Sequence, residues 1–190
     1  MFINKTKLKN KKINQAVILC GGLGTRLSPI TNKIPKPMVK IKKIPFLWYL
    51  LDKLSDNGIK RFLFLTGYLG DSIKSYFGDG EKFNWIINYS NGPHNWNTAR
   101  RVWEAKDLLD DNFLLCYADN FVQIRLDFIY EKWIKDTSKI WITLSNKKKG
   151  NVIFLDKQHI KYDAKRVNPN SNFVELGFMF TKKDLILNAI

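Results

Sequence analysis

The sequence predicts an α/β domain built on a mostly parallel, doubly wound sheet. Between residues 15 and 145, short apolar runs typical of buried strands alternate with segments whose apolar residues have helical spacing. The first run leads directly into the glycine-rich turn Gly21-Gly22-Leu23-Gly24. With 190 residues and a hydrophobic fraction of 45%, the chain suits one well-cored domain and is short for two. We therefore expect one domain over residues 15–190, preceded by a basic flexible tail over residues 1–14.

The predicted strands are apolar runs bounded by glycines or polar turns. They cover 16–20, 61–66, 83–89, 112–117 and 140–144, with short candidates at 151–155 and 158–162 and a longer one at 173–180. The predicted helices cover 46–57, about 71–77, 98–109, about 126–136 and a last segment that begins near residue 182. Between the first strand and the first helix, the chain has Pro29, Pro35, Pro37 and Pro45. These prolines exclude a continuous helix and indicate an extended, rigid loop.

The composition restricts the classes of partner. The formal net charge is +15, and its positive field suits anionic substrates. We do not expect a nucleic-acid partner, because no recognised module or arginine-rich stripe accompanies the charge. The five lysines of residues 1–14 predict a solvated tail, with contact to a lipid or another polyanion as the alternative.

The cysteines and the apolar runs predict a location. Cys20 and Cys116 lie in strand-like runs, as expected for free thiols in a reducing compartment. No apolar run approaches the roughly 18 residues that a membrane span needs, and the N-terminus does not read as a secretory signal. These features predict a cytoplasmic protein without a membrane partner.

The segment from Gly21 to Lys36 has the chemistry of a phosphate cradle. Gly21, Gly22 and Gly24 allow the backbone to approach a ligand closely. Arg26 and Lys36, ten residues apart, are both able to hold phosphate oxygens. A buried strand, a glycine turn and fixed cations together indicate a nucleotide-phosphate site. The spacing matches neither the Walker pattern nor the dinucleotide-binding G-x-G-x-x-G pattern.

The compound motif resembles the signature of the sugar-phosphate nucleotidyltransferases, also called nucleotide-sugar pyrophosphorylases. It consists of Gly21-Gly22-x-Gly24-Thr25-Arg26-Leu27-x-Pro29, Thr31 and Pro35-Lys36-Pro37-Met38. The resemblance continues through Ile44-Pro45, Gly67-Tyr68 and residues 76–80, and covers nearly all of residues 15–180. It implies the Rossmann-like fold of the GT-A type. Trp48 and the segments 96–104 and 117–120 look most similar to guanylyl- or cytidylyltransferases that act on mannose-like or heptose 1-phosphates.

The resemblance also implies a reaction. A sugar 1-phosphate oxygen attacks the α-phosphorus of a nucleoside triphosphate, with GTP or CTP favoured, and pyrophosphate leaves in line. The nucleophile is already ionised, so no serine, cysteine or histidine base is needed. The expected product is a nucleotide sugar for surface polysaccharide. The alternative is a catalytically silent regulatory or assembly subunit of the same fold, and self-association is left open.

Matching positions assign roles at the nucleotide. Arg26 would clamp the departing pyrophosphate, and Lys36 would hold the α-phosphate or the sugar phosphate. The remaining nucleotide contacts implied by the resemblance come from Gly21, Gly22, Gly24, Thr25 and Thr98. Arg100 and Arg101, which follow Thr98, are either further anion contacts or solvated residues on a helix.

Acidic residues complete the implied site. Asp119 follows the strand 112–117, at the sheet edge where open parallel sheets place their ligands, and would hold Mg²⁺. The alternative for Asp119 is a capping role. Glu175 and Gly177 match the family's site for sugar hydroxyls, and Lys165 or Arg166 would substitute for a sugar-phosphate lysine. The family usually continues beyond residue 190 with a second metal-binding aspartate, so we expect this chain to be truncated at its C-terminus.

Overall fold

The structure of the chain is a computed structural model that describes residues 13–123, 125–156, 159–163 and 165–190. The basic tail predicted for residues 1–14 therefore falls, except for residues 13 and 14, outside the described residues.

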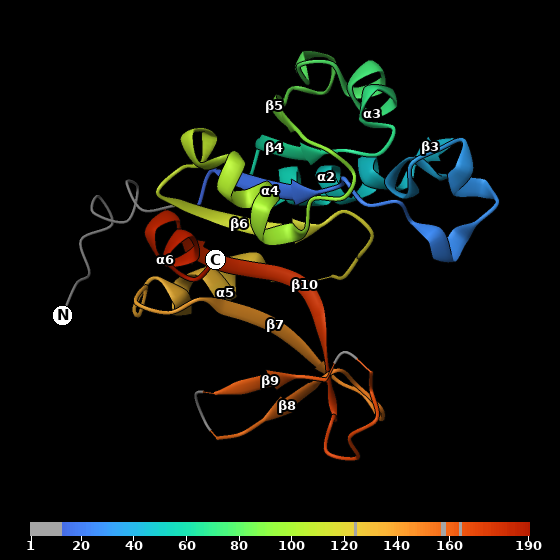
Figure 1. Cartoon of the computed structure of the whole chain (residues 1–190). Helices are drawn as coiled ribbons and strands as arrows, with labels where there is room; N and C mark the ends of the chain where they lie inside the picture. Colours follow the sequence, from blue (N-terminus) through green and yellow to red (C-terminus); the bar gives the residue numbers. More distant parts are fainter. Residues whose placement is uncertain (1–12, 124, 157–158, 164) are drawn as a thin grey trace, which may run out of the picture.

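Among the described residues, eight strands form one sheet (Figure 1). Its order is β5-β4-β1-β6-β10-β8-β9, and β7 also pairs with β10. The strands are β1 (Gln15–Leu19), β4 (Arg61–Thr66), β5 (Ile86–Asn91), β6 (Asn112–Tyr117), β7 (Trp141–Asn146), β8 (Val152–Phe154), β9 (Ile160–Tyr162) and β10 (Phe173–Lys182). The neighbours β5, β4, β1 and β6 are parallel, as predicted, and the strands beyond β6 pair antiparallel.

Five α-helices are present in the described ranges: α2 (Phe46–Asp56), α3 (Gly70–Phe77), α4 (Thr98–Glu104), α5 (Leu126–Trp133) and α6 (Lys183–Asn188). The proline-rich segment contains no α-helix, in agreement with the prediction. It forms the short 3₁₀ turns Thr25–Leu27, Ile30–Asn32 and Lys36–Met38, followed by the two-stranded ribbon of β2 (Lys40–Ile41) and β3 (Ile44–Pro45). No helix of the described chain combines the length and the apolar character that crossing a bilayer requires.

Both faces of the sheet are buried, which confirms the doubly wound prediction. In β1, Ala16 and Ile18 pack into one core cluster, and Val17 packs into a second cluster on the opposite face. The first cluster receives α2, α3 and α5, and the second receives α4 and α6. Helix α2 contributes Leu47, Leu50, Leu51 and Leu54, the leucines at helical spacing in the sequence.

Several predicted boundaries differ from the structure. The strand expected from residue 83 begins at Ile86, because residues 81–83 form a 3₁₀ turn and Asn84 adopts a left-handed φ of 60°. The helix expected over 98–109 ends at Glu104 and gives way to the 3₁₀ turn Lys106–Leu108. The helix expected to reach residue 136 ends at Trp133. In each case the apolar residues extend beyond the helix or strand, because the backbone turns within the apolar pattern.

Strand β10 links two parts of the molecule. Its second half pairs with β6 in the central sheet, its start pairs with β8, and β7 pairs with both halves. The register shifts between Glu175 and Met179, where Gly177 has a φ of 78°. Figure 1 shows β10 bending there toward the β8–β9 hairpin. We call residues 147–176, which include this hairpin and the start of β10, the hairpin lobe.

Candidate functional site

A cavity of about 430 Å³ lies at the carboxyl ends of β1 and β6. Leu19 and Tyr117 are partners in the parallel register, so the segments that follow the two strands leave the sheet side by side. The Ala118 N–H donates to the Leu19 carbonyl at 3.2 Å and joins these segments. This is the sheet edge at which the sequence predicted a ligand site.

The glycine turn forms one wall of the cavity. Gly24 has a φ of 65°, and a Cβ there would lie 2.9 Å from the Lys36 Cβ, so a side chain would force the two apart. The buried Thr31 hydroxyl donates to the Gly24 carbonyl at 3.1 Å. The turn and the lysine are thus held against each other, as the combined motif requires.

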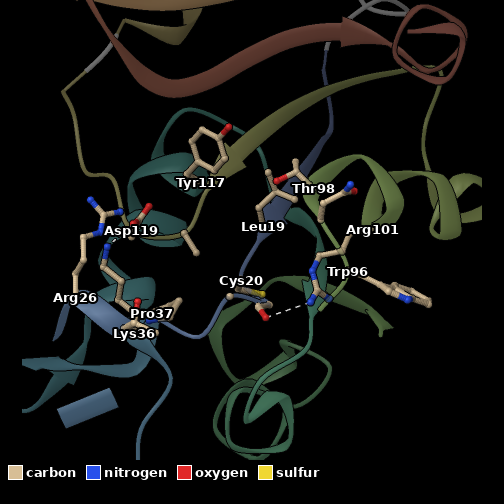
Figure 2. Close-up of a pocket in the computed structure, with 16 residues that line it drawn as sticks. Leu19, Cys20, Arg26, Lys36, Pro37, Trp96, Thr98, Arg101, Tyr117 and Asp119 are labelled. Atoms are coloured by element: carbon tan, nitrogen blue, oxygen red, sulfur yellow. Dashed lines mark hydrogen bonds and ion pairs between the residues drawn. The ribbon is translucent and has the colours of Figure 1, made fainter. Parts of the chain in front are cut away.

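Three charged residues gather on one side of the cavity: Arg26, Lys36 and Asp119 (Figure 2). The Lys36 ammonium donates to Asp119 Oδ2 in an ion pair that is partly exposed to solvent. The pair joins residues 83 positions apart in the sequence. An incoming polyanion would attract Lys36 away from the carboxylate and leave Asp119 free to ligate a cation.

Few other metal-ligating side chains lie near Asp119 in the described part of the chain. In the part of the chain that the structure describes, no three His, Cys, Asp or Glu residues cluster as a metal centre. Mg²⁺ in nucleotide enzymes is usually held by one or two carboxylates, phosphate oxygens and water. A single carboxylate beside a phosphate cradle therefore fits one protein ligand of such an ion.

The opposite side of the cavity is built by the start of α4. Asn97 caps this helix, because its Oδ1 accepts from the Arg100 N–H at 2.8 Å. Thr98 lines the cavity, and Trp96 packs against Gly92, where a Cβ would overlap the indole ring. Arg100 points outward, pairs with Glu104 at 2.5 Å and lies over the Trp96 ring.

Arg101 differs from what the sequence suggested. The solvated alternative is wrong for this residue, because only 6% of it is exposed. Its guanidinium donates to the backbone carbonyls of Gly21, Thr66 and Pro93. Burial lowers the pKa of Arg101. Arg101 directly follows the exposed Arg100, and nothing in the sequence distinguishes the buried arginine from the exposed one.

A second cavity, of about 490 Å³, adjoins the first. The two share Arg26, Lys36, Tyr117 and Asp119. The hairpin lobe completes the second cavity with Asn151, Tyr162, Arg166, Val174 and Glu175. Of the two cations considered for a sugar phosphate, Arg166 lines the cavity and Lys165 does not.

Glu175 is a half-buried acidic residue of the second cavity. Its Oε2 accepts from the Tyr162 hydroxyl at 2.8 Å, while its Oε1 is buried without a hydrogen-bond partner. Burial raises the pKa of Glu175, and the Tyr162 hydrogen bond partly opposes this. An unpaired buried acceptor is costly, so Oε1 is suited to receive a ligand hydroxyl.

Gly177 lines neither cavity but lies against Tyr117 and Asn120, which line the second one. A Cβ at Gly177 would come within 2.5 Å of Tyr117 and 2.6 Å of Asn120. Asn120 in turn donates to the Leu176 carbonyl at 3.0 Å. The lack of a side chain at Gly177 thus lets these two lining residues take their places.

The sequence comparison decides the family. Residues 15–153 match the family described as "Nucleotidyl transferase". The chain belongs to the nucleotidyl transferase family. This confirms the resemblance to the sugar-phosphate nucleotidyltransferases that the motifs predicted.

Two curated relatives act on sugar 1-phosphates by name. The "Probable glucose-1-phosphate cytidylyltransferase" of Bacillus subtilis (strain 168) is 40% identical over 133 residues, which cover 59% of this chain and 52% of that protein. The "D-glycero-alpha-D-manno-heptose 1-phosphate guanylyltransferase" of Aneurinibacillus thermoaerophilus is 30% identical over 164 residues, 83% of this chain and 70% of the relative. The chain thus spans about half the length of the Bacillus nucleotidyl transferase.

Solved structures confirm the nucleotidyl transferase fold. A putative glucose-1-phosphate thymidylyltransferase from Bacillus anthracis superimposes with a TM-score of 0.78 at 20% identity, covering 90% of this chain and 72% of that one. HddC from Yersinia pseudotuberculosis, complexed with GMP-PN, gives a TM-score of 0.76 at 22% identity and covers 93% of this chain and 80% of the other. At these identities the likeness concerns the fold alone.

Proposed function

We propose that the protein transfers a nucleotidyl group from a nucleoside triphosphate to a sugar 1-phosphate, giving a nucleotide sugar and pyrophosphate. One observation carries the proposal: the two cavities meet at Arg26, Lys36 and Asp119. A triphosphate in the first cavity and a sugar phosphate in the second would therefore meet at shared charges. Placing two polyanions together is the main demand of this reaction.

In the first cavity the glycine turn receives the triphosphate. Backbone N–H groups of Gly21, Gly22 and Gly24, with the Thr25 hydroxyl, donate to phosphate oxygens, and Thr98 contacts the nucleotide from the other wall. Arg26 binds the β- and γ-phosphates, because its planar fork matches two oxygens at once. These contacts hold the leaving pyrophosphate in line with the attacking oxygen.

In the second cavity the hairpin lobe receives the sugar 1-phosphate. Glu175 Oε1 accepts a hydrogen bond from a sugar hydroxyl, and Arg166 supplies a cation for the sugar phosphate. Lys36 leaves Asp119 and approaches the α-phosphate. A phosphate oxygen of the sugar then forms a bond to the α-phosphorus, the α–β anhydride bond breaks, and its electron pair leaves on pyrophosphate.

Asp119 is the proposed protein ligand for Mg²⁺. Bound there, the ion would offset negative charge on the triphosphate oxygens. The chain's own contribution is the position of the carboxylate, at the end of β6 and next to Lys36. The exchange of partners frees both side chains at the moment the substrate enters.

The choice of nucleotide and the cellular role extend the proposal. GTP and CTP are the candidate nucleotides, because the two relatives are named as a cytidylyltransferase and a guanylyltransferase. Use of the product in surface polysaccharide is part of the same proposal. A cytoplasmic location stays a prediction, as do self-association and the division into a tail and one domain.

The proposal is tested by pyrophosphate release with Mg²⁺, crossing the four nucleoside triphosphates with several sugar 1-phosphates. We expect turnover with GTP or CTP, loss of turnover in Lys36→Met, and normal turnover in Lys33→Met, which removes an exposed lysine of the same loop. No turnover with any pair of nucleoside triphosphate and sugar 1-phosphate would refute the proposed enzymatic activity. Tight triphosphate binding without turnover would support the silent-subunit alternative.

A further inference from the structure

The guanidinium of Arg101 ties together three segments that surround the nucleotide cavity. Nη1 donates to the Thr66 carbonyl at 2.6 Å, and Nη2 donates to the carbonyls of Pro93 at 2.7 Å and Gly21 at 3.2 Å. These carbonyls belong to the end of β4, the loop before α4 and the glycine turn after β1. Figure 2 shows the guanidinium of Arg101 beside Cys20, with a hydrogen bond to the glycine turn.

Burying the charge of Arg101 costs folding free energy. None of the ion pairs between described residues includes Arg101, so its charge is compensated by backbone carbonyls. Burying a guanidinium without a carboxylate carries a large desolvation penalty. Its neighbour Val102 already anchors α4 in an apolar cluster. A costly group beside a ligand cavity, where an apolar contact already holds the helix, indicates a functional reason.

The surrounding glycines make room for this group. A Cβ on Gly21 would overlap the guanidinium of Arg101, and a Cβ on Gly67 would lie 2.6 Å from Nη2. The same lack of side chains leaves the glycine turn free to rotate its peptide groups. Something other than the side chains must therefore hold the turn in one shape.

The Gly21 carbonyl is the part of the turn that is held. It accepts from Arg101, which also lines the cavity, and from the Tyr68 N–H. In a trans peptide the N–H points opposite to the C=O. With the Gly21 carbonyl held by these two donors, the N–H of Gly22, a residue that lines the cavity, is fixed on the opposite side of the peptide.

We propose that Arg101 is a positioning residue that locks the Gly21–Gly22 peptide with its N–H toward the phosphates of the bound nucleotide. The inference rests on the proposed function for the identity of the ligand. Without Arg101 only the Tyr68 N–H holds the Gly21 carbonyl, so the peptide is less restrained and the donor array that receives the triphosphate must be ordered further on binding.

The reactivity of Cys20 measures whether the glycine turn is held in place. Cys20 directly precedes Gly21, is 2% exposed, and directs its thiol to the Leu65 carbonyl at 3.5 Å. Burial raises the pKa of the Cys20 thiol to about 12, so it reacts only when the turn opens. Cys116 is fully buried within β6 and serves as an internal control, because it reacts only when the sheet opens.

The test compares N-ethylmaleimide labelling of the two thiols at about pH 8, located by peptide mass spectrometry. Arg101→Met keeps the length and removes the donors, Arg101→Lys keeps one donor group, and Arg100→Met is the matched control on the exposed neighbour. We expect Cys20 of Arg101→Met to label about tenfold faster or more, with Cys116 unchanged. Arg101→Lys should fall between, and Arg100→Met should match the unmodified protein.

Kinetics give the second readout. In Arg101→Met the KM for the nucleoside triphosphate should rise about tenfold, while kcat falls by less than about threefold. Arg101→Lys should recover part of the affinity. An effect on kcat alone would contradict a positioning role.

Two labelling results would overturn the proposal. One is a folded Arg101→Met protein in which Cys20 labels at the unmodified rate. The other is parallel labelling of both cysteines in Arg101→Met and Arg101→Lys, which would make Arg101 a general stability residue. The labelling requires no turnover, so failure of the enzymatic proposal and failure of the positioning proposal give different results.

Discussion

Replacing Glu175 with glutamine should make the protein more stable at neutral pH and less active. The carboxylate is half-buried, Tyr162 satisfies one oxygen, and the other oxygen is buried without a partner. Glutamine is nearly isosteric and keeps an acceptor for Tyr162, but it carries no charge to desolvate. A residue that lowers stability in order to bind a ligand is expected to show this opposition between stability and activity.

The magnitude follows from the unpaired oxygen. A buried acceptor without a partner costs about 1–3 kcal/mol, and the glutamine amide recovers only part of this because its nitrogen also lacks a partner. We therefore expect Glu175→Gln to raise the free energy of unfolding by about 1 kcal/mol. In a chain of this size that corresponds to a rise of about 2–4 °C in Tm.

The gain should depend on pH in a defined direction. Burial raises the pKa of Glu175 above its ordinary value of 4.5, so the folded protein holds this proton more tightly than the unfolded chain does. The stability of the unmodified protein relative to Glu175→Gln therefore falls as the pH rises from 4.5 to the raised pKa. The two proteins should be equally sensitive to pH above that window.

Urea unfolding from about pH 4 to pH 8 measures this difference, and pyrophosphate release measures the activity. The exposed Glu131→Gln is the matched control and should change neither. The reasoning is refuted if Glu175→Gln is destabilised at pH 7, or if its stability difference from the unmodified protein does not change with pH.

Three further predictions use other parts of the site. Asp119→Asn and Lys36→Met should each lower pyrophosphate release by about 100-fold or more, while urea unfolding changes by less than about 1 kcal/mol, because their ion pair is partly exposed. Gly177→Ala should cost about 1–3 kcal/mol, since its φ is 78°, and should raise the KM for the sugar 1-phosphate more than that for the nucleotide. Asn97→Ala should destabilise α4 by about 1 kcal/mol in thermal unfolding, and Asn97→Asp should restore most of it.

Local sequence patterns were sufficient for most of the fold. The leucines of α2 and the apolar run of β1 determine their own secondary structure, because burial and helical or strand spacing are local properties. The antiparallel direction of β10 was not predicted. A strand's direction depends on which neighbour it meets, and β10 meets β6, some sixty residues earlier in the chain.

The part of the candidate site that lies in the local motif was likewise predictable from the sequence. Side chains in the compound motif, such as Arg26 and Lys36, reach the cavity because prolines and glycines fix their backbone locally. The buried position of Arg101 was not predicted, since its partners are backbone carbonyls from three separate segments and these leave no trace in the side-chain pattern. The same holds for the contact of Tyr162 with Glu175, which depends on how the hairpin folds against β10.

The bend of β10 at Gly177 has a consequence for how this scaffold accommodates change. Residues up to Asp119 form the nucleotide cavity, while the hairpin lobe adds the residues that only the second cavity has, apart from Asn120. The two regions are joined in the sheet by the bent strand β10, which β7 accompanies on both sides of the bend. Such a division is modular: exchanging residues 147–176 for those of another member would transplant one substrate preference while leaving the other intact.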